Sequence, residues 1–260
     1  MSHSDWSSYT HLIPWVEAAG RPLPGIQPLG QSPLFLIGED YADQMHTKRA
    51  LISERKSLVL AQAATLGEST LAAVYNFALS TILTQPGFER NEGDRLTCPD
   101  GVHVKLDPAK PLETLGNCIQ EDICVMEKRD TRHVLTAALL TFPAGWRLSE
   151  KIGKPLDRIH APVREYPEIA RRVQRLFDGV QEGRPLWRAN ALWYAHNTLY
   201  APLGEDTPRA PSPEGQGWLR SERQVIARVP GSQAVVFIIR TMICAGADAR
   251  VDQRVSQEQV

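Results

Sequence analysis

The sequence predicts an α+β fold with a mainly antiparallel sheet and helices gathered to one side. Two observations support this prediction. Long segments with apolar residues three and four apart, as in a helix, fill residues 43–85 and about 166–180, whereas most apolar segments between 102 and 244 are short and strand-like. Successive strand candidates are joined by short polar turns, and strands linked in this way pair antiparallel.

Composition limits the size and the partners of the protein. Of the 260 residues, 42% are hydrophobic, which is enough to bury a sizeable core, and we expect a single domain over residues 1–260. The 29 basic and 30 acidic residues give a formal net charge of −1, so no positive excess exists to bind phosphates or anionic lipid. The most apolar run, AVVFIIRTMICAGA, is too short to span a bilayer and contains Arg240. We therefore expect a cytoplasmic protein with neither a nucleic-acid nor a membrane partner.

The N-terminal third divides into two parts. Residues 1–40 are rich in proline and glycine and predict an irregular lead-in on the surface. Residues 43–85 contain mainly good helix formers, with a break near Gly67 and a stop at Pro86 and Gly87. This pattern predicts a helical hairpin or two consecutive helices.

Three segments in the middle of the chain have the composition and short length of strands. They are VHVKL (102–106), EDICVMEK (121–128) and HVLTAALLTFPA (133–144). A polar turn at 129–132 joins the last two, which predicts a hairpin.

The C-terminal part begins with a predicted helix from about Tyr166 to Val180, followed by a strand at 186–197. Two further strands, at 219–229 and 234–244, flank a tight turn and predict a second hairpin. Residues 245–260 are expected to form a tail.

The cysteines and common sequence motifs do not identify an active site. Cys98, Cys118, Cys124 and Cys244 include no C-x-x-C pair and no haem attachment sequence, and we expect buried free thiols. The sequence also has no P-loop, G-x-G-x-x-G, H-E-x-x-H or G-x-S-x-G motif. If the protein is an enzyme, we expect it to take its chemistry from a cofactor.

His160 is a candidate metal ligand in the segment WRLSEKIGKPLDRIHAPVREYP (146–167). Pro155 and Pro162 restrict the backbone on both sides of it, and a neutral imidazole is a standard axial ligand of haem iron. The same segment supplies apolar side chains for a slot and cations for propionates, namely Trp146, Ile152, Leu156 and Ile159, and Arg147, Lys151, Lys154 and Arg158. The alternative is a structural histidine in a solvated basic loop, in which case His103, His133 and His196 would be the next candidate ligands.

Two further clusters are candidates for binding charged groups. Glu121 and Asp122 begin an apolar strand, where alternation turns at least one of them inward, and a protonated amine is one possible partner. The alternatives are a solvated strand end or a pair with an arginine of the sheet. Arg223 and Arg240, in the last two strands, would need an anionic partner such as a propionate or Glu121 if buried. A surface ion pair is the simpler explanation.

Three stretches, taken in their order along the chain, together resemble the alpha-subunit family of haem-dependent oxidative N-demethylases. They are NCIQEDICVMEK, LTFPAGWRLSEKIGKPLDRIHAPVREYP and WLRSERQVIARVPGSQAVVFIIRT, and the resemblance runs from about Pro24 to Ile243. It implies a PAS-like haem-binding fold, a curved and mainly antiparallel sheet with flanking helices, in which His160 is the proximal ligand of haem b. The family usually has an adjacent Asn-Trp pair, whereas Asn190 and Trp193 are separated here.

The resemblance also implies an activity and a set of roles. The expected reaction is oxidative N-demethylation of a small secondary amine, which uses O2 and releases formaldehyde. Its electrons would come from a flavin and iron–sulfur reductase subunit or partner, because the sequence has no motif for either group. The expected catalytic residues are Glu121 and Asp122, and the expected haem-binding residues are Trp146, Lys151, Arg158, Arg223 and Arg240.

The alternative function is a haem-binding PAS-type sensor of gas or redox state, or a relative without catalytic activity. Fold alone does not distinguish these functions. Sensors are usually coupled to an output domain, and only GADARVDQRVSQEQV follows the last predicted strand, so we expect the enzyme.

Overall fold

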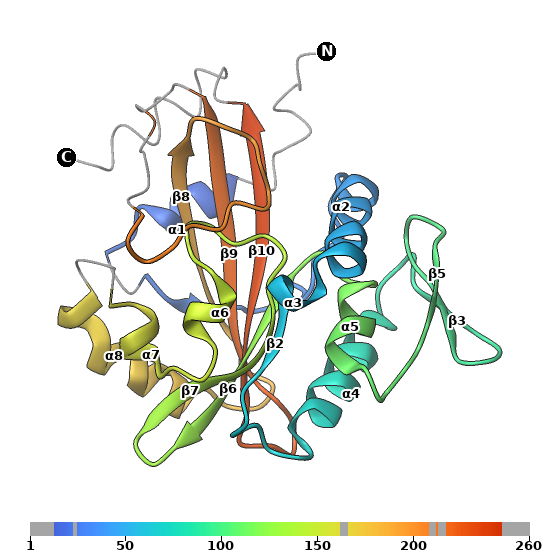
Figure 1. Cartoon of the computed structure of the whole chain (residues 1–260), viewed down its shortest axis with the longest axis horizontal. Helices are drawn as coiled ribbons and strands as arrows, with labels where there is room; N and C mark the ends of the chain where they lie inside the picture. Colours follow the sequence, from blue (N-terminus) through green and yellow to red (C-terminus); the bar gives the residue numbers. More distant parts are fainter. Residues whose placement is uncertain (1–12, 23–24, 162–165, 208–211, 213–216, 246–260) are drawn as a thin grey trace.

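The computed structural model describes residues 13–22, 25–161, 166–207, 212 and 217–245. Its centre is a seven-stranded sheet in which all paired neighbours are antiparallel (Figure 1). The strands, in spatial order, are β1 (Gln27–Pro28), β8 (Leu186–Tyr194), β9 (Trp218–Arg228), β10 (Val235–Ala245), β6 (Asp122–Arg129), β7 (Arg132–Leu139) and β2 (Leu60–Gln62). The prediction of an α+β fold with a mainly antiparallel sheet is confirmed, and the architecture is compatible with the PAS-like arrangement.

Both predicted hairpins are present and form most of the sheet. β6 and β7 turn at Asp130, whose positive φ of 52° is a conformation that a short polar residue tolerates. β9 and β10 pair over eleven residues, from Val235 opposite Arg228 to Ala245 opposite Trp218. Because β10 also pairs with β6, the two hairpins join edge to edge in one continuous sheet.

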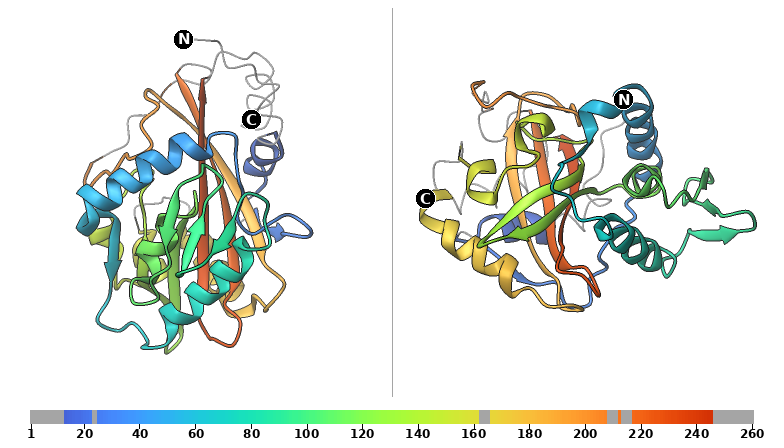
Figure 2. Two further views of the ribbon diagram at one scale, coloured as in Figure 1. Left: turned by 90° about the vertical axis from the view of Figure 1, so that its right-hand side faces the viewer. Right: turned by 60° about the horizontal axis from the view of Figure 1, so that its bottom comes forward.

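Helices cover both faces of this sheet (Figures 1 and 2). One face, called here the α2 face, carries α1 (Ile13–Ala19), α2 (Tyr41–Glu54), α4 (Thr70–Ile82) and α5 (Pro111–Gly116). The other, the α8 face, carries α6 (Leu148–Lys151), α7 (Leu156–Ile159) and α8 (Tyr166–Gly179). The expectation that helices gather to one side is therefore wrong. β10 explains why, because its nearly continuous apolar run supplies Val236 and Ile238 to one core and Val235 and Ile239 to the other.

The predicted helical region 43–85 holds more than two helices. α2 and α4 are confirmed, but α3 (Lys56–Val59) and the edge strand β2 lie between them. A separate three-stranded sheet, β3 (Glu89–Asn91), β4 (Arg95–Thr97) and β5 (His103–Lys105), follows α4. Of these strands the sequence predicted only the segment at 102–106. Strands of three residues are too short to show a clear alternation.

The lead-in predicted to be irregular contains regular structure. α1 and β1 lie within residues 1–40, and α1 packs Trp15 against the sheet beside Trp193. Residues 1–12 and 23–24 of the lead-in, and residues 246–260 of the predicted tail, lie outside the described residues. The division into domains stays a prediction.

Two other expectations can be compared with the structure. All four cysteines are free and buried, as predicted. Within the part of the chain that the structure describes, no helix is long and apolar enough to cross a membrane.

Candidate functional site

The predicted site residues lie on opposite faces of the sheet. Trp146 and Ile159 pack into the apolar cluster of the α8 face, and His160 directly follows Ile159 at the end of α7. Arg223 and Arg240 are opposite each other in the register of β9 and β10. Arg223 is two positions from Val225, and Arg240 is two positions from Ile238, and both of these apolar residues pack in the core of the α2 face. Because every second residue of a strand faces the same side, both arginines lie on the α2 face.

Glu121 lies on the α2 face, where it binds the backbone of the segment that precedes α2. Its side chain is 1% exposed, and Oε1 accepts a hydrogen bond from the Leu36 N–H at 2.7 Å. Oε2 has no hydrogen-bond partner among the described residues. Burial raises the pKa of Glu121, while the charge of Arg240, the Leu36 hydrogen bond and the charge of Arg223 oppose this shift.

The two arginines beside Glu121 are already bonded to oxygen atoms of the protein. Arg223 donates to the carbonyls of Leu34 at 3.2 Å and Pro33 at 2.6 Å. Arg240, which is 1% exposed, donates to Asp40 at 2.5 Å and to Gln44 and the carbonyl of Thr241, each at 2.6 Å. The arginines are therefore not a surface ion pair, and they hold residues 33–44 against the sheet.

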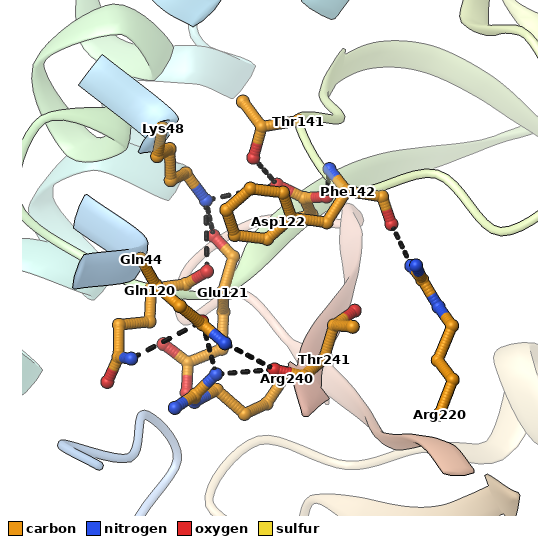
Figure 3. A network of polar contacts seen from close by, with 10 residues as sticks. All are labelled: Gln44, Lys48, Gln120, Glu121, Asp122, Thr141, Phe142, Arg220, Arg240 and Thr241. Carbon is orange, nitrogen blue, oxygen red and sulfur yellow. Dashed lines mark hydrogen bonds and ion pairs between the residues drawn. The ribbon is translucent and has the colours of Figure 1, made fainter. Parts of the chain in front are cut away.

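Asp122 is the anionic partner of a buried lysine (Figure 3). Lys48 of α2 is 0% exposed, and its Nζ lies 3.0 Å from Asp122 Oδ1 and 2.5 Å from the carbonyl oxygen of Glu121. Burial lowers the pKa of Lys48, and the charge of Asp122 opposes this. Asp122 also accepts from Thr141 Oγ1 at 2.6 Å and from the Phe142 N–H at 2.7 Å. A solvated strand end is thus excluded, and the partner is a lysine rather than an arginine of the sheet.

Phe142 connects this buried pair to the α8 face (Figure 3). Its carbonyl oxygen accepts from Arg220 Nη2 at 2.6 Å. Arg220 also donates to the carbonyl of Leu199 at 3.1 Å and to Glu222 Oε1 at 3.4 Å. The position of Arg220 therefore depends on the backbone that Asp122 holds.

Polar side chains form a row on the α8 face of β8 and β9, called here the polar row. Its members are Arg188, Asn190, Arg220, Glu222 and Gln224, and Arg188 pairs with Gln224 and Asn190 with Glu222 in the strand register. Glu222 is only 7% exposed, and its Oε2 accepts from Gln224 at 3.1 Å and Asn190 at 3.4 Å. Arg220, Glu222 and Gln224 therefore share one face of β9.

His160 is half-buried and positioned by its own helix. Its Nδ1 lies 2.9 Å from the carbonyl oxygen of Leu156. A carbonyl oxygen only accepts, so Nδ1 carries the hydrogen and the lone pair lies on Nε2. Burial lowers the pKa of His160, and the positive charges of Lys151 and Arg188 lower it further, while the Leu156 hydrogen bond opposes them. The imidazole is therefore neutral at pH 7 and within electrostatic range of Arg188.

The other residues predicted in this segment differ in their surroundings. Lys151 is 3% exposed and donates to the Ile159 carbonyl and to Glu205, both at 2.8 Å, so it ties α6 to the residue before His160. Trp146 is partly buried against the apolar cluster of the α8 face. Arg158 is exposed.

Arg188 belongs to the candidate site although sequence reasoning did not single it out. Its Nε is buried and has no hydrogen-bond partner among the described residues. Burial lowers the pKa of Arg188, and the charge of Glu222 opposes this. The available signal was its alternation with Asn190 in β8, which places both side chains on the face of Glu222.

The residues of the α8 face fit a haem group. Haem needs a neutral imidazole, an apolar surface and cations for its propionates, which His160, the apolar cluster with Trp146 and Arg188 would supply. Thr241 adds a second buried polar atom, Oγ1, that lacks a partner among the described residues and lies opposite Glu222 in the register. Within the described part of the chain, no three His, Cys, Asp or Glu side chains gather as a metal-ion site.

Comparison with known families agrees with the predicted resemblance. The family model described as haem-dependent oxidative N-demethylase, alpha subunit-like, matches residues 25–258. The match includes both hairpins, the polar row and the segment that carries His160. The chain belongs to the family of haem-dependent oxidative N-demethylase alpha-subunit-like proteins.

Proposed function

We propose that the chain binds haem b through His160 on the α8 face and oxidises an N-methyl group of a small secondary amine. The observation that carries this proposal is the Nδ1 contact of His160 with the Leu156 carbonyl, which puts the lone pair on Nε2 of a neutral imidazole. When bound, haem supplies the activation of O2 that such an oxidation requires. Family membership supports both parts of the proposal.

The chain's own residues would orient the cofactor. The Leu156 carbonyl fixes the tautomer and the plane of the His160 ring, as partners of ligating histidines generally do. Lys151 holds the end of α7 through the Ile159 carbonyl, which limits movement of the neighbouring His160. The Nε of Arg188 would find in a propionate the acceptor that the described protein residues do not provide.

Glu222 is the best-placed counter-ion for a protonated amine. It lies on the same face as His160 and Arg188, and the amide donors of Asn190 and Gln224 contact it at 3.1 to 3.4 Å. Its other oxygen, Oε1, has only a long contact with Arg220 Nε at 3.4 Å, and a protonated amine on the substrate would make a stronger hydrogen bond at Oε2 than the two neutral amides do. We therefore assign this role to Glu222.

The carboxylates expected from the sequence would act at a distance from the amine. Asp122 is already paired with the buried ammonium of Lys48, and Glu121 lies on the α2 face. We propose that Asp122 is a positioning residue, because it holds Phe142 and thereby Arg220. Glu121 would keep the segment before α2 in place.

The electrons would come from another protein. The family description names an alpha subunit, and this supports a partner subunit. We propose that the partner carries the flavin and iron–sulfur groups for which the chain has no motif.

The activity is tested with the haem-loaded chain, a flavin and iron–sulfur reductase, and a panel of secondary N-methyl amines. The expected result is formaldehyde release that requires O2, the amine and the reductase together. Glu222→Gln should weaken amine-induced changes in the Soret band, by about tenfold for each 1.4 kcal/mol of binding lost. Glu92→Gln, at an exposed carboxylate in the turn between β3 and β4, is the control. If no amine changes the spectrum or yields formaldehyde, the demethylase proposal fails and the sensor alternative gains support.

A further inference from the structure

Three arginines form one exposed face of α8, called here the basic face. Arg171, Arg172 and Arg175 are all exposed. Residues three and four apart lie on the same side of a helix, so Arg175 lies beside the other two. The opposite side of α8 carries Val173 and Phe177, which pack in the apolar cluster of the α8 face. The arginines therefore face away from the protein.

The basic face has a positive charge that its neighbours do not cancel. Asp178, near the end of α8, is paired with Lys128 at 2.6 Å. Among the described residues, no carboxylate forms an ion pair with any of the three arginines. Glu168, exposed one turn earlier on the same side, offsets one of their charges. Three positive charges against one negative charge leave an excess of two, although the chain has a formal net charge of −1.

Several hydrogen bonds hold α8 in a fixed position. Gln174 Oε1 accepts from the backbone N–H of His133 at 3.1 Å, which ties the helix to β7. Arg228 of β9 donates to the carbonyl of Phe177 at 3.0 Å and to that of Asp178 at 3.2 Å. The basic face is therefore held in place before a partner arrives, so binding there orders little of the backbone.

The basic face lies on the helix that packs against the segment of His160. α8 contacts α7, and the two helices lie side by side (Figures 1 and 2). Phe177 shares the apolar cluster of the α8 face with Leu156 and Ile159 of α7, and Ile159 directly precedes His160. A protein bound at the basic face would therefore lie close to the proposed haem site. Electron transfer slows steeply with distance, so this position suits an electron donor.

We propose that the basic face is the docking surface for the electron-donating partner, and that it binds acidic side chains around the partner's iron–sulfur cluster. The inference rests on the proposed function. Guanidinium groups bind carboxylates with paired hydrogen bonds, so an acidic surface is the complementary chemistry. One electron passes from the reduced cluster to ferric haem iron. The cluster is oxidised, the iron becomes ferrous, and no bond forms or breaks.

The expected complex is transient. Opposite charges bring the two proteins together quickly and orient them, while a small polar interface allows them to separate after the transfer. Salt screens exposed charges, so added salt should slow the encounter.

The test measures how fast a reduced, acidic [2Fe–2S] ferredoxin reduces the haem of the full, haem-loaded chain. Carbon monoxide traps the ferrous product, and stopped-flow absorbance follows its Soret band. The α8 variant combines Arg171→Glu, Arg172→Glu and Arg175→Glu. Its second-order rate constant at low salt should be about tenfold or more below that of the wild type. The wild-type rate should fall as salt is added, whereas the rate of the α8 variant should not.

A matched control reverses three charges on the small sheet. It combines Arg90→Glu, Arg95→Glu and Lys105→Glu, all at exposed positions. Both variants change the net charge equally, so the comparison isolates the effect of the basic face, and the control should be reduced at a rate near that of the wild type. All three proteins should have the same haem content and the same carbon monoxide spectrum after chemical reduction. Equal loss of rate in both variants, a wild-type rate in the α8 variant or no reduction of the wild type overturns the inference.

Two further measurements separate this inference from the proposed function and from membrane binding. If formaldehyde is released but the α8 variant is reduced as fast as the wild type, the docking inference fails and the proposed function stands. A wild type that takes up no haem contradicts both. Vesicles that contain phosphatidylserine test the other anionic surface. If they bind the wild type but not the α8 variant, and ferredoxin reduces both equally, the basic face binds a membrane and the inference is overturned.

Discussion

Arg220 and Asp122 bind the same residue, Phe142, from opposite directions. Asp122 accepts from its N–H at 2.7 Å, and Arg220 donates to its carbonyl oxygen at 2.6 Å. One peptide segment thus connects a buried ion pair beside α2 with the polar row on the α8 face. A change at Asp122 is therefore expected to affect both stability and the proposed substrate site.

Replacing Asp122 by Asn should strongly destabilise the protein. The variant keeps the shape of the side chain but leaves the ammonium of Lys48 buried without its anionic partner. Loss of one member of a buried pair costs about 3–5 kcal/mol, which urea unfolding would measure. The control is Asp157→Asn, at an exposed ion pair with Arg132, for which a loss of about 1 kcal/mol or less is expected. Equal losses of unfolding free energy in the two variants would show that the buried Lys48–Asp122 pair contributes no more to stability than an exposed ion pair does.

Replacing Glu121 by Gln should remove part of the pH dependence of stability. The pKa of Glu121 is raised, so the folded protein holds this proton more tightly than the unfolded chain does. The contribution of Glu121 is therefore most favourable below its ordinary pKa and decreases as the pH rises through the folded-state value. Unfolding free energies measured from pH 4 to pH 8 should fall less with rising pH in the variant than in the wild type. A larger fall in the variant would contradict this assignment.

Replacing Arg188 by Gln should weaken haem binding. A charge-assisted hydrogen bond to a propionate contributes about 1.5–3 kcal/mol, so the dissociation constant should rise by about tenfold or more. Arg158→Gln is the matched control because Arg158 is exposed near the end of α7. The haem affinity of this variant should stay near that of the wild type. Haem titrations followed at the Soret band distinguish the two variants. If Arg158→Gln has the larger effect, the propionates lie toward α7 instead.

The sequence alone predicts the parts of this fold that depend on neighbours in the chain. Short turns and alternating residues identify both hairpins. The prolines beside His160 are less informative, because Pro155 directly precedes the short helix α7 and Pro162 lies outside the described residues. The alternation of β9 also separates Glu222 from Arg223 correctly. These features need no knowledge of how distant segments pack.

The remaining parts of the site depend on contacts between distant segments. Lys48 is a polar residue in a helix and gives no sign that it reaches the start of β6, 74 positions away. Arg223 lies on the face opposite the proposed haem site, and local alternation could not show this because it does not say which face of the sheet the His160 segment covers. Arg188 was missed for the same reason, since a lone arginine in a strand has the same pattern whether it faces solvent or a site.

The central claim is that the imidazole of His160 ligates haem iron, and His160→Gly tests it most directly. Wild type should bind one haem per chain, and the variant should lose or greatly weaken the Soret band because its axial ligand is missing. Added free imidazole should restore the band in His160→Gly, because it fills the space of the lost side chain. His103→Gly, at an exposed position on β5, should bind haem as the wild type does. A His160→Gly spectrum equal to that of wild type without imidazole would contradict the claim.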